Sequence, residues 1–444
     1  MEITRTLARY VVSSNLNDIP EAVQSEAVRS IVNWLGCAVG GCRHETIDRA
    51  LEGLGPFSGK PEATLMGRGE KLDIFLTALL NGISSHVFDF DDTHLKTIIH
   101  PAGPVASALF ALSEHMPISG AEFLHAFILG VEVECRIGNA VYPEHYDVGW
   151  HITGTAGVFG AAAAVGKILA LDEQKMVWAL GIAGTQSSGF REMFGTMCKS
   201  FHPGRAAQNG LLAAFLAQKN FTSSDQVLEA KRGFSNVMST QHNYDEITEN
   251  LGQSFEIALN TYKPFACGIV IHPSIDGGIQ LKNELNLTGG EIEKIQLKVA
   301  PLVLELTGKK TPQTGLEGKF SVYHSLAVAI IHGAASENEY SDSCVRNPEV
   351  IALRDKVEAV IDETMRDDEA RVTVICKDGR IVEKHVPHAI GSLERPMSND
   401  DIEEKFIGLV SKVLGQEKTV NLLKLAWSVS SLDDVSEICR ASAP

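Results

Sequence analysis

Helical periodicity dominates the first 263 residues of the chain, and no stretch there has the pattern of a convincing β-strand. In residues 20–40, for example, Ala27, Ile31 and Leu35 recur at helical spacing. The same pattern predicts helices over 73–85, 105–114, 122–141, 154–166, 171–184, 206–218 and, more weakly, 245–259. Such a series predicts a large all-helical domain.

Small residues fill one of these segments, residues 154–166. Packed Gly and Ala allow helices to approach closely, so we predict a central helix here. The alternative is a glycine-rich phosphate loop, but the G-K-[ST] pattern is absent and no strand precedes the segment.

Strand patterns begin only after residue 263. Residues 292–306 alternate in part and are rich in β-branched side chains, which predicts a strand. Residues 370–376 and 380–386 flank a Lys-Asp-Gly turn, and Asp-Gly readily adopts the positive φ angles of a tight hairpin. The sequence therefore predicts a segment of mixed α and β structure.

Helical sequence returns at Ser398, which has the pattern of a helix N-cap. If these last helices pack on the first ones, the mixed segment becomes an insertion. The predicted fold class is mainly α: a large all-helical domain built from both chain ends (residues 1–263 and 396–444) plus a smaller α+β domain (residues 264–395).

Composition and charge limit the classes of function. A hydrophobic content of 44% and a charged content of 21% are typical of a soluble globular protein. The net charge of -17 argues against nucleic acid or an anionic membrane surface as the main partner. The eight cysteines form no C-x-x-C pair, the start lacks a secretory signal, and the apolar runs are too short to span a membrane. We therefore predict a cytoplasmic protein with reduced thiols.

A polar cluster between two apolar segments is the first candidate for chemistry. It contains His86, Asp89, Asp91, Asp92, Thr93, His94 and His100. Between apolar helices these groups should be partly buried, and buried carboxylates and imidazoles have shifted pKa values that are common in functional sites. The pattern favours an active-site segment; the alternative is a capped helix start with ordinary surface histidines.

A basic grouping, Lys199, His202 and Arg205, stands just ahead of the Ala-rich residues 206–218. Backbone N–H groups at a helix start favour anions, and Arg can bind a carboxylate through two parallel hydrogen bonds. In so acidic a chain this grouping predicts a carboxylate pocket, the alternative being a solvated basic loop. Similar polar breaks occur at Gly149-Trp150-His151, Lys263-Pro264, His272-Pro273 and Lys319-Phe320-Ser321.

The motifs HVFDFDDTH…HPAG, GWH-x-TGT-x-G-x-FGAAAA, GTMCKSFHPGRAAQNG, KPFACG…HP and EGKFS resemble, in order and over essentially the whole chain, those of the MmgE/PrpD family. That family includes 2-methylcitrate dehydratases, cis-aconitate decarboxylases and an iminodisuccinate epimerase. The resemblance implies a helical domain made from both chain ends, an α+β lid and a homodimer. It also implies a site between the domains that needs no metal or organic cofactor.

Site residues follow from the resemblance by matching motif. The family's active-site positions fall on Asp89, Thr93, His100, His151, Lys199 and His272. Predicted substrate-binding residues are His202, Arg205, Lys263, Tyr323 and His324. The usual tyrosine of the family maps on His324, with Tyr323 one place earlier, so this chain departs from the family there.

These residues predict a cofactor-independent lyase acting on a small di- or tricarboxylate. Lys199 and Arg205 would hold carboxylates, and His151 or His272 would remove or return a proton α to a carboxylate. His100 or a tyrosine would serve as the acid. Dehydration of the 2-methylcitrate type ranks first, decarboxylation of the cis-aconitate type second and epimerisation third.

Two other classes of protein remain as alternatives. In a metal-dependent hydrolase a divalent ion would be bound by Asp89, Asp91, Asp92, His86 and His94. Activity that survives exhaustive chelation would exclude this class. A non-catalytic binding or scaffold protein on the same fold would bind a metabolite without turnover.

Overall fold

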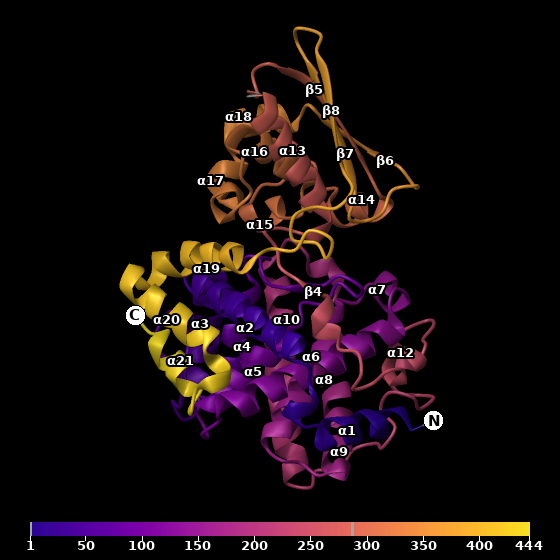
Figure 1. Ribbon diagram of the computed structural model, residues 1–444, viewed down its shortest axis with the longest axis vertical. Coiled ribbons are helices and arrows are strands. Elements are labelled where there is room, and N and C mark those ends of the chain that lie inside the picture. Colours follow the sequence, from indigo (N-terminus) through magenta and orange to yellow (C-terminus); the bar gives the residue numbers. More distant parts are fainter. Residues whose placement is uncertain (1, 286–287) are drawn as a thin grey trace.

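The computed structural model describes residues 2–285 and 288–444, which form a large helical domain and a smaller α+β domain above it (Figure 1). The fold class is mainly α, as predicted. None of the helices in the described part of the chain is both long and apolar enough to cross a membrane. We call the smaller domain, residues 264–395, the lid; its boundaries stay a prediction.

The helical domain takes its elements from both chain ends. Its helices are α1 (Ile3–Ser13), α2 (Glu21–Gly41), α3 (Glu45–Leu54), α4 (Ile74–His86), α5 (Ala102–Ser113), α6 (Gly120–Val141), α7 (Glu144–Val148), α8 (Ile152–Ile168), α9 (Glu173–Gly184), α10 (Met197–Gln218), α11 (Phe234–Met238), α12 (Asp245–Thr248), α19 (Asn399–Leu414), α20 (Gln416–Trp427) and α21 (Ser436–Ala441). Its strands are the short pairs β1 (Ala63–Thr64) with β2 (Lys71–Leu72) and β3 (Thr93–His94) with β4 (Asn260–Thr261).

Helix α10 packs along α8 and α4 at the centre of this domain. A Cβ on Gly82 of α4 would lie only 2.4 Å from the Cα of Gly204 in α10. A Cβ on Gly210 would meet the Cβ of Ala161 in α8 at 2.4 Å. Only small residues permit backbones this close, and the prediction of a central helix at residues 154–166 is confirmed.

One acidic side chain, Glu134 of α6, lies inside this core and is fully buried. A Cβ on Gly160 of α8 would lie 2.7 Å from its Oε2, so the glycine makes room for the carboxyl group. Neither carboxyl oxygen has a hydrogen-bond partner among residues 2–285 and 288–444. Burial, with a smaller contribution from Asp92, raises the pKa of Glu134 well above its ordinary value, so this side chain is uncharged at neutral pH.

The C-terminal helices close the domain. Helix α19 packs against α2, and a Cβ on Gly36 would lie 3.0 Å from the Phe406 ring. Ser398 and Asp401 form the capping box at the start of α19, as the sequence predicted. The chain passes between the domains near residues 263 and 395, and these crossings are neighbours: a Cβ on Gly391 would lie 2.5 Å from the Tyr262 carbonyl oxygen.

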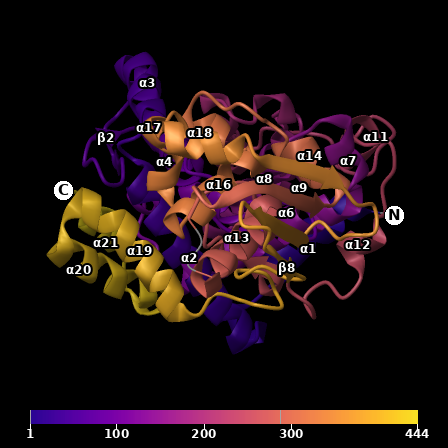
Figure 2. The same ribbon diagram turned by 90° about the horizontal axis from the view of Figure 1, so that it is seen from above.

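The lid places helices on one face of a four-stranded sheet (Figure 1). Its elements are α13 (His272–Leu285), β5 (Ile292–Val299), α14 (Pro301–Thr307), α15 (Gly315–Gly318), α16 (Val322–His332), α17 (Asp342–Val345), α18 (Pro348–Arg354), β6 (Val357–Ile361), β7 (Ala370–Cys376) and β8 (Ile381–Val386). The strand order is β6-β5-β7-β8, and only the β5–β6 pair is parallel. Seen from above, the lid covers the middle of the helical domain and leaves α19–α21 at one edge (Figure 2).

The predicted hairpin is confirmed by β7 and β8, with Gly379 at φ 87° in the turn. The predicted strand over 292–306 is right only to Val299, because Pro301 starts α14, a position that suits proline. The predicted helix over 245–259 is wrong. Residues 245–248 form one short helix and 256–259 a 3-10 turn, because positive φ angles at Asn250 and Gly252 break the helix between them.

Helix α10 begins at Met197 rather than at residue 206, capped by Thr196. Proline usually ends a helix, yet Pro203 lies inside this one. Lys199 and His202 therefore lie in the first turns of the helix itself, and the alternative of a solvated basic loop is wrong for them.

Candidate active site

A small cavity lies between the helical domain and the lid, with a volume of about 30 Å³. The helical domain lines it with Asp89, Ile98, His100, Tyr146, His151, Phe194, Lys199 and Lys263, and the lid with Gly268, Ile269, Val270, Leu306, Thr307 and Phe320. A space of this size holds roughly two water molecules. A polycarboxylate is larger than this space as it stands.

Asp89 is the charged centre of this cavity. Its Oδ1 lies 3.0 Å from Nζ of Lys199 and 2.6 Å from Nζ of Lys263. Burial alone would raise the pKa of Asp89, but the two ammonium groups outweigh it and hold that pKa well below its ordinary value. The two ammonium groups thus share the ionised carboxylate of Asp89, and the charge of Asp91 also acts on Lys199.

The backbone brings Asp89, Lys199 and Lys263 together, and we call these three residues the trio. Asp89 follows α4 with φ at 51°, a left-handed conformation that Asp tolerates better than most residues. Pairing of β3 with β4 joins Thr93 to Thr261 and so brings Lys263 back to Asp89. Lys405 of α19 holds this crossing, because its Nζ donates to the carbonyl oxygens of Phe90 and Lys263 at 2.6 and 2.9 Å.

Three buried imidazoles surround the trio, and each is fixed through Nδ1. Nδ1 of His86 lies 2.7 Å from Oδ2 of Asp91. Nδ1 of His100 donates to the carbonyl oxygen of Asp92 at 2.8 Å. Nδ1 of His151 lies 2.8 Å from Nδ1 of His202, so one of these two rings donates to the other.

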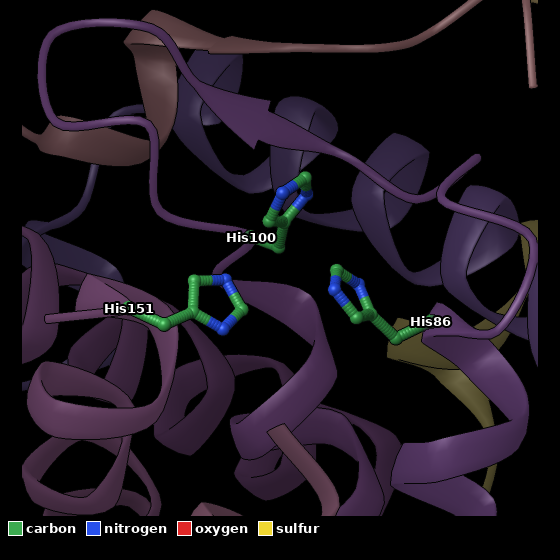
Figure 3. Close-up of side chains that lie close together, drawn as sticks. All are labelled: His86, His100 and His151. Carbon is green, nitrogen blue, oxygen red and sulfur yellow. The ribbon is translucent and has the colours of Figure 1, made fainter. Parts of the chain in front are cut away.

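The three rings face a common centre (Figure 3). One ring nitrogen from each lies within 4.8 Å of the others, a spacing that a metal ion could bridge after small side-chain rotations. Burial is the largest cause that lowers the pKa of His86, and it lowers the pKa values of His100 and His151 further, well below their ordinary value. All three rings are therefore neutral at rest and can accept a proton.

A family model described as the MmgE/PrpD N-terminal domain matches residues 5–247, and one described as the MmgE/PrpD C-terminal domain matches residues 265–429. The chain belongs to the MmgE/PrpD family. This membership was predicted from the ordered motifs and is confirmed.

Relatives of this MmgE/PrpD chain include cis-aconitate decarboxylases that match over almost their whole length. It is 27% identical to the enzyme of Aspergillus terreus, over 98% of this chain and 95% of the relative. It is 26% identical to the enzyme of Homo sapiens, over 98% of this chain and 93% of the relative. The mitochondrial 2-methylcitrate dehydratase of Yarrowia lipolytica is 23% identical over 53% of this chain and 49% of the relative. The chain is a lyase of the MmgE/PrpD type.

Five of the predicted residues line the cavity: Asp89, His100, His151, Lys199 and Lys263. His202 lies behind His151, and the Thr93 hydroxyl lies 3.4 Å from Nδ1 of His100. The catalytic and binding roles of these residues stay predictions.

The remaining predicted residues lie elsewhere. Arg205 is exposed on α10, where its guanidinium bonds Gln208, because its turn of the helix faces solvent. His272 is buried beside Phe265, and burial lowers its pKa to about 3. His324 is buried in the lid, with Nε2 at 2.8 Å from the Glu339 carbonyl oxygen. Tyr323 is also buried, and neither it nor His324 is among the cavity-lining residues.

Several residues of the site were missed as such by sequence reasoning. Tyr146 lines the cavity from α7, and the Arg191 guanidinium lies 4.2 Å from its ring centroid. Phe194 and Phe320 line it from the two domains, with Nζ of Lys199 about 5 Å from each ring centroid. His86 was noticed only as a member of the polar cluster. Isolated aromatic residues form no sequence motif, so the sequence carried no signal for these positions.

Proposed function

We propose that the chain removes CO₂ from a small tricarboxylate of the cis-aconitate type. The observation that carries this proposal is the pair of ammonium groups at Asp89, where Lys199 and Lys263 share one carboxylate in a small cavity between the domains. In a chain with a net charge of -17, two buried ammonium groups in one cavity suit a ligand with several carboxylates. The full-length similarity to cis-aconitate decarboxylases supports the choice of reaction.

The proposed reaction is a decarboxylation that shifts the double bond of the substrate. The bond between the methylene carbon and its carboxylate breaks, and CO₂ leaves without the bonding pair. That pair forms a new double bond to the central carbon, and the pair of the old double bond moves to the carbon α to the other terminal carboxylate. This carbon takes one proton from a cavity imidazolium, and itaconate forms. Lys199 and Lys263 would stabilise the carboxylate onto which the negative charge spreads.

Dehydration of a 2-methylcitrate-type substrate is the second candidate. An imidazole of the cavity would remove the α-proton, and Tyr146 or His100 would protonate the leaving hydroxyl group. The motifs alone ranked dehydration first. It now ranks second, because the dehydratase relative matches only about half of this chain. Epimerisation stays third.

The test is proton NMR of the purified, chelator-treated chain in D₂O with cis-aconitate, 2-methylcitrate, citrate and iminodisuccinate. We expect itaconate from cis-aconitate, with one deuterium at the carbon that is protonated. An alkene formed with loss of water from 2-methylcitrate would instead establish dehydration. Absence of turnover and of deuterium exchange in every compound would contradict the lyase proposal, and activity that needs an added divalent ion would favour the hydrolase alternative.

Substrate binding is expected to draw protons into the site. The imidazoles are neutral in the free chain because burial lowers their pKa values, and a nearby polycarboxylate raises them again. Proton uptake on binding should therefore be measurable near neutral pH by titration calorimetry in buffers of different ionisation enthalpy. It should increase as the pH falls toward 6 and decline above about pH 8. Binding without uptake across this range would contradict the charge assignment of the imidazoles.

The homodimer and the cytoplasmic location implied above remain part of this proposal.

A further inference from the structure

We propose that Asp91 and His86 form a proton-transfer pair, and that Nε2 of His86 gives up the proton that the reaction consumes. The proposal rests on the lyase function proposed above. It adds a residue that none of the family's active-site positions includes.

The pair has the geometry of a carboxylate that fixes an imidazole. His86 is the last residue of α4, and its Nδ1 lies 2.7 Å from Oδ2 of Asp91, with both side chains fully buried. Burial would raise the pKa of Asp91, but His86 and His100 outweigh it and lower that pKa below its ordinary value. An ionised carboxylate only accepts hydrogen bonds, so Nδ1 of His86 carries the proton and Nε2 carries the lone pair.

Nε2 of His86 is buried and has no hydrogen-bond partner in the part of the chain that the structure describes. A buried polar atom without a partner is costly, which suits an atom that bonds substrate. His86 lines a second small cavity, of about 10 Å³, together with Lys199 and Phe320. These two residues also line the cavity at Asp89. His86 therefore stands next to the ammonium group that would bind a substrate carboxylate.

A comparison of the three imidazoles singles out His86. Its Nδ1 lies 2.7 Å from the ionised carboxylate of Asp91. Nδ1 of His100 lies farther from that carboxylate, at 3.5 Å, and donates to a backbone carbonyl, and Nδ1 of His151 pairs with another imidazole. A carboxylate stabilises an imidazolium more than either neutral group does. His86 is thus the ring of the three that can best hold a proton ready for transfer.

In the proposed decarboxylation, imidazolium His86 gives its Nε2 proton to the α-carbon as CO₂ leaves. The ring returns to the neutral state, with its Nδ1 proton still bonded to Asp91. Solvent supplies the next proton when the lid opens.

The experiment replaces Asp91 by asparagine. An Asn side chain can donate its amide N–H to Nδ1 of His86, which moves the imidazole proton to Nε2 and removes the charge that stabilises the imidazolium. We expect kcat to fall roughly 10²- to 10⁴-fold. We also expect the basic limb of the pH profile, which reports loss of the His86 proton, to shift toward lower pH, while circular dichroism stays unchanged.

Asp92→Asn is the matched control. Asp92 is the next residue and is equally buried, but its carboxylate accepts from Asn260 and Ser30 rather than from a histidine. Its pKa is raised to about 7, mainly by burial and then by Asp91, so asparagine mimics a form that it already populates. We expect kcat within a few-fold of the wild type. Equal losses in the two variants would overturn the proposal.

A second readout needs no substrate. Nitrogen NMR of histidine-labelled chain should show an unprotonated Nε2 at His86 in the wild type and a protonated one in Asp91→Asn. A protonated Nε2 in the neutral wild-type ring would overturn the assignment of the pair. If the wild type turns over none of the polycarboxylates, the proposed function fails, and the NMR result still separates that failure from a wrong description of the pair.

Discussion

Replacing Lys199 by alanine is expected to lower kcat/KM for the active polycarboxylate by about 10³-fold. Its Nζ lies 3.0 Å from Oδ1 of Asp89 and lines both small cavities. A substrate carboxylate that loses this ammonium group loses a charge partner in a buried site, where the attraction between charges is stronger than in water. Steady-state kinetics with the substrate identified by NMR would measure the effect.

The fold should survive this change, because Asp89 keeps Lys263 as a partner at 2.6 Å. Lys60→Ala is a suitable control, since the Lys60 side chain is 81% exposed and does not line the cavity. Its kcat/KM should equal that of the wild type. Unchanged turnover of Lys199→Ala with every active substrate would show that Lys199 does not bind the substrate.

Replacing Glu134 by glutamine is expected to flatten the dependence of stability on pH. The folded chain keeps Glu134 protonated because its pKa is raised far above that of the unfolded chain. Between these two pKa values the unfolded state releases the proton and the folded state does not, so stability falls as the pH rises. The loss is about 1.4 kcal/mol per pH unit for one such group, and glutamine cannot ionise.

Urea unfolding at pH 5.5 and 7.5 measures this effect. The advantage of Glu134→Gln over the wild type should grow by about 2 to 3 kcal/mol between these pH values. Glu52→Gln is the control, because the Glu52 side chain is 78% exposed and should change nothing. A constant difference between Glu134→Gln and the wild type would mean that Glu134 is already ionised in the folded chain.

Much of the fold followed from local sequence patterns. The apolar repeats around Ile31 and the Asp-Gly turn at Gly379 are local signals, and the structure confirms both. Predictions from local patterns were wrong where contacts between distant parts of the chain determine the structure. The predicted helix started at residue 206, but α10 begins at Met197 and continues through Pro203, and its Gly204 packs closely against Gly82 of α4.

For the site, too, the sequence predicted some features and could not predict others. The motifs predicted Asp89 and Lys199, and these two side chains do meet. The motifs could not show that Arg205 faces solvent, because the direction of a helical side chain depends on which face of the helix packs against its neighbours. Nor could they show that His86 is held by Asp91, since that depends on the path of the chain after α4.

The packing of α19 on α2 has a consequence for biosynthesis. The surface of α2 that receives Phe406 and Leu409 leaves the ribosome well before these two side chains do, because the lid is made between them. The lid lies wholly between them in the sequence and can fold while this surface is still open. A nascent chain that stops before residue 399 would therefore present an apolar surface to chaperones or to other chains. Loss of α19 would therefore uncover the apolar face of α2.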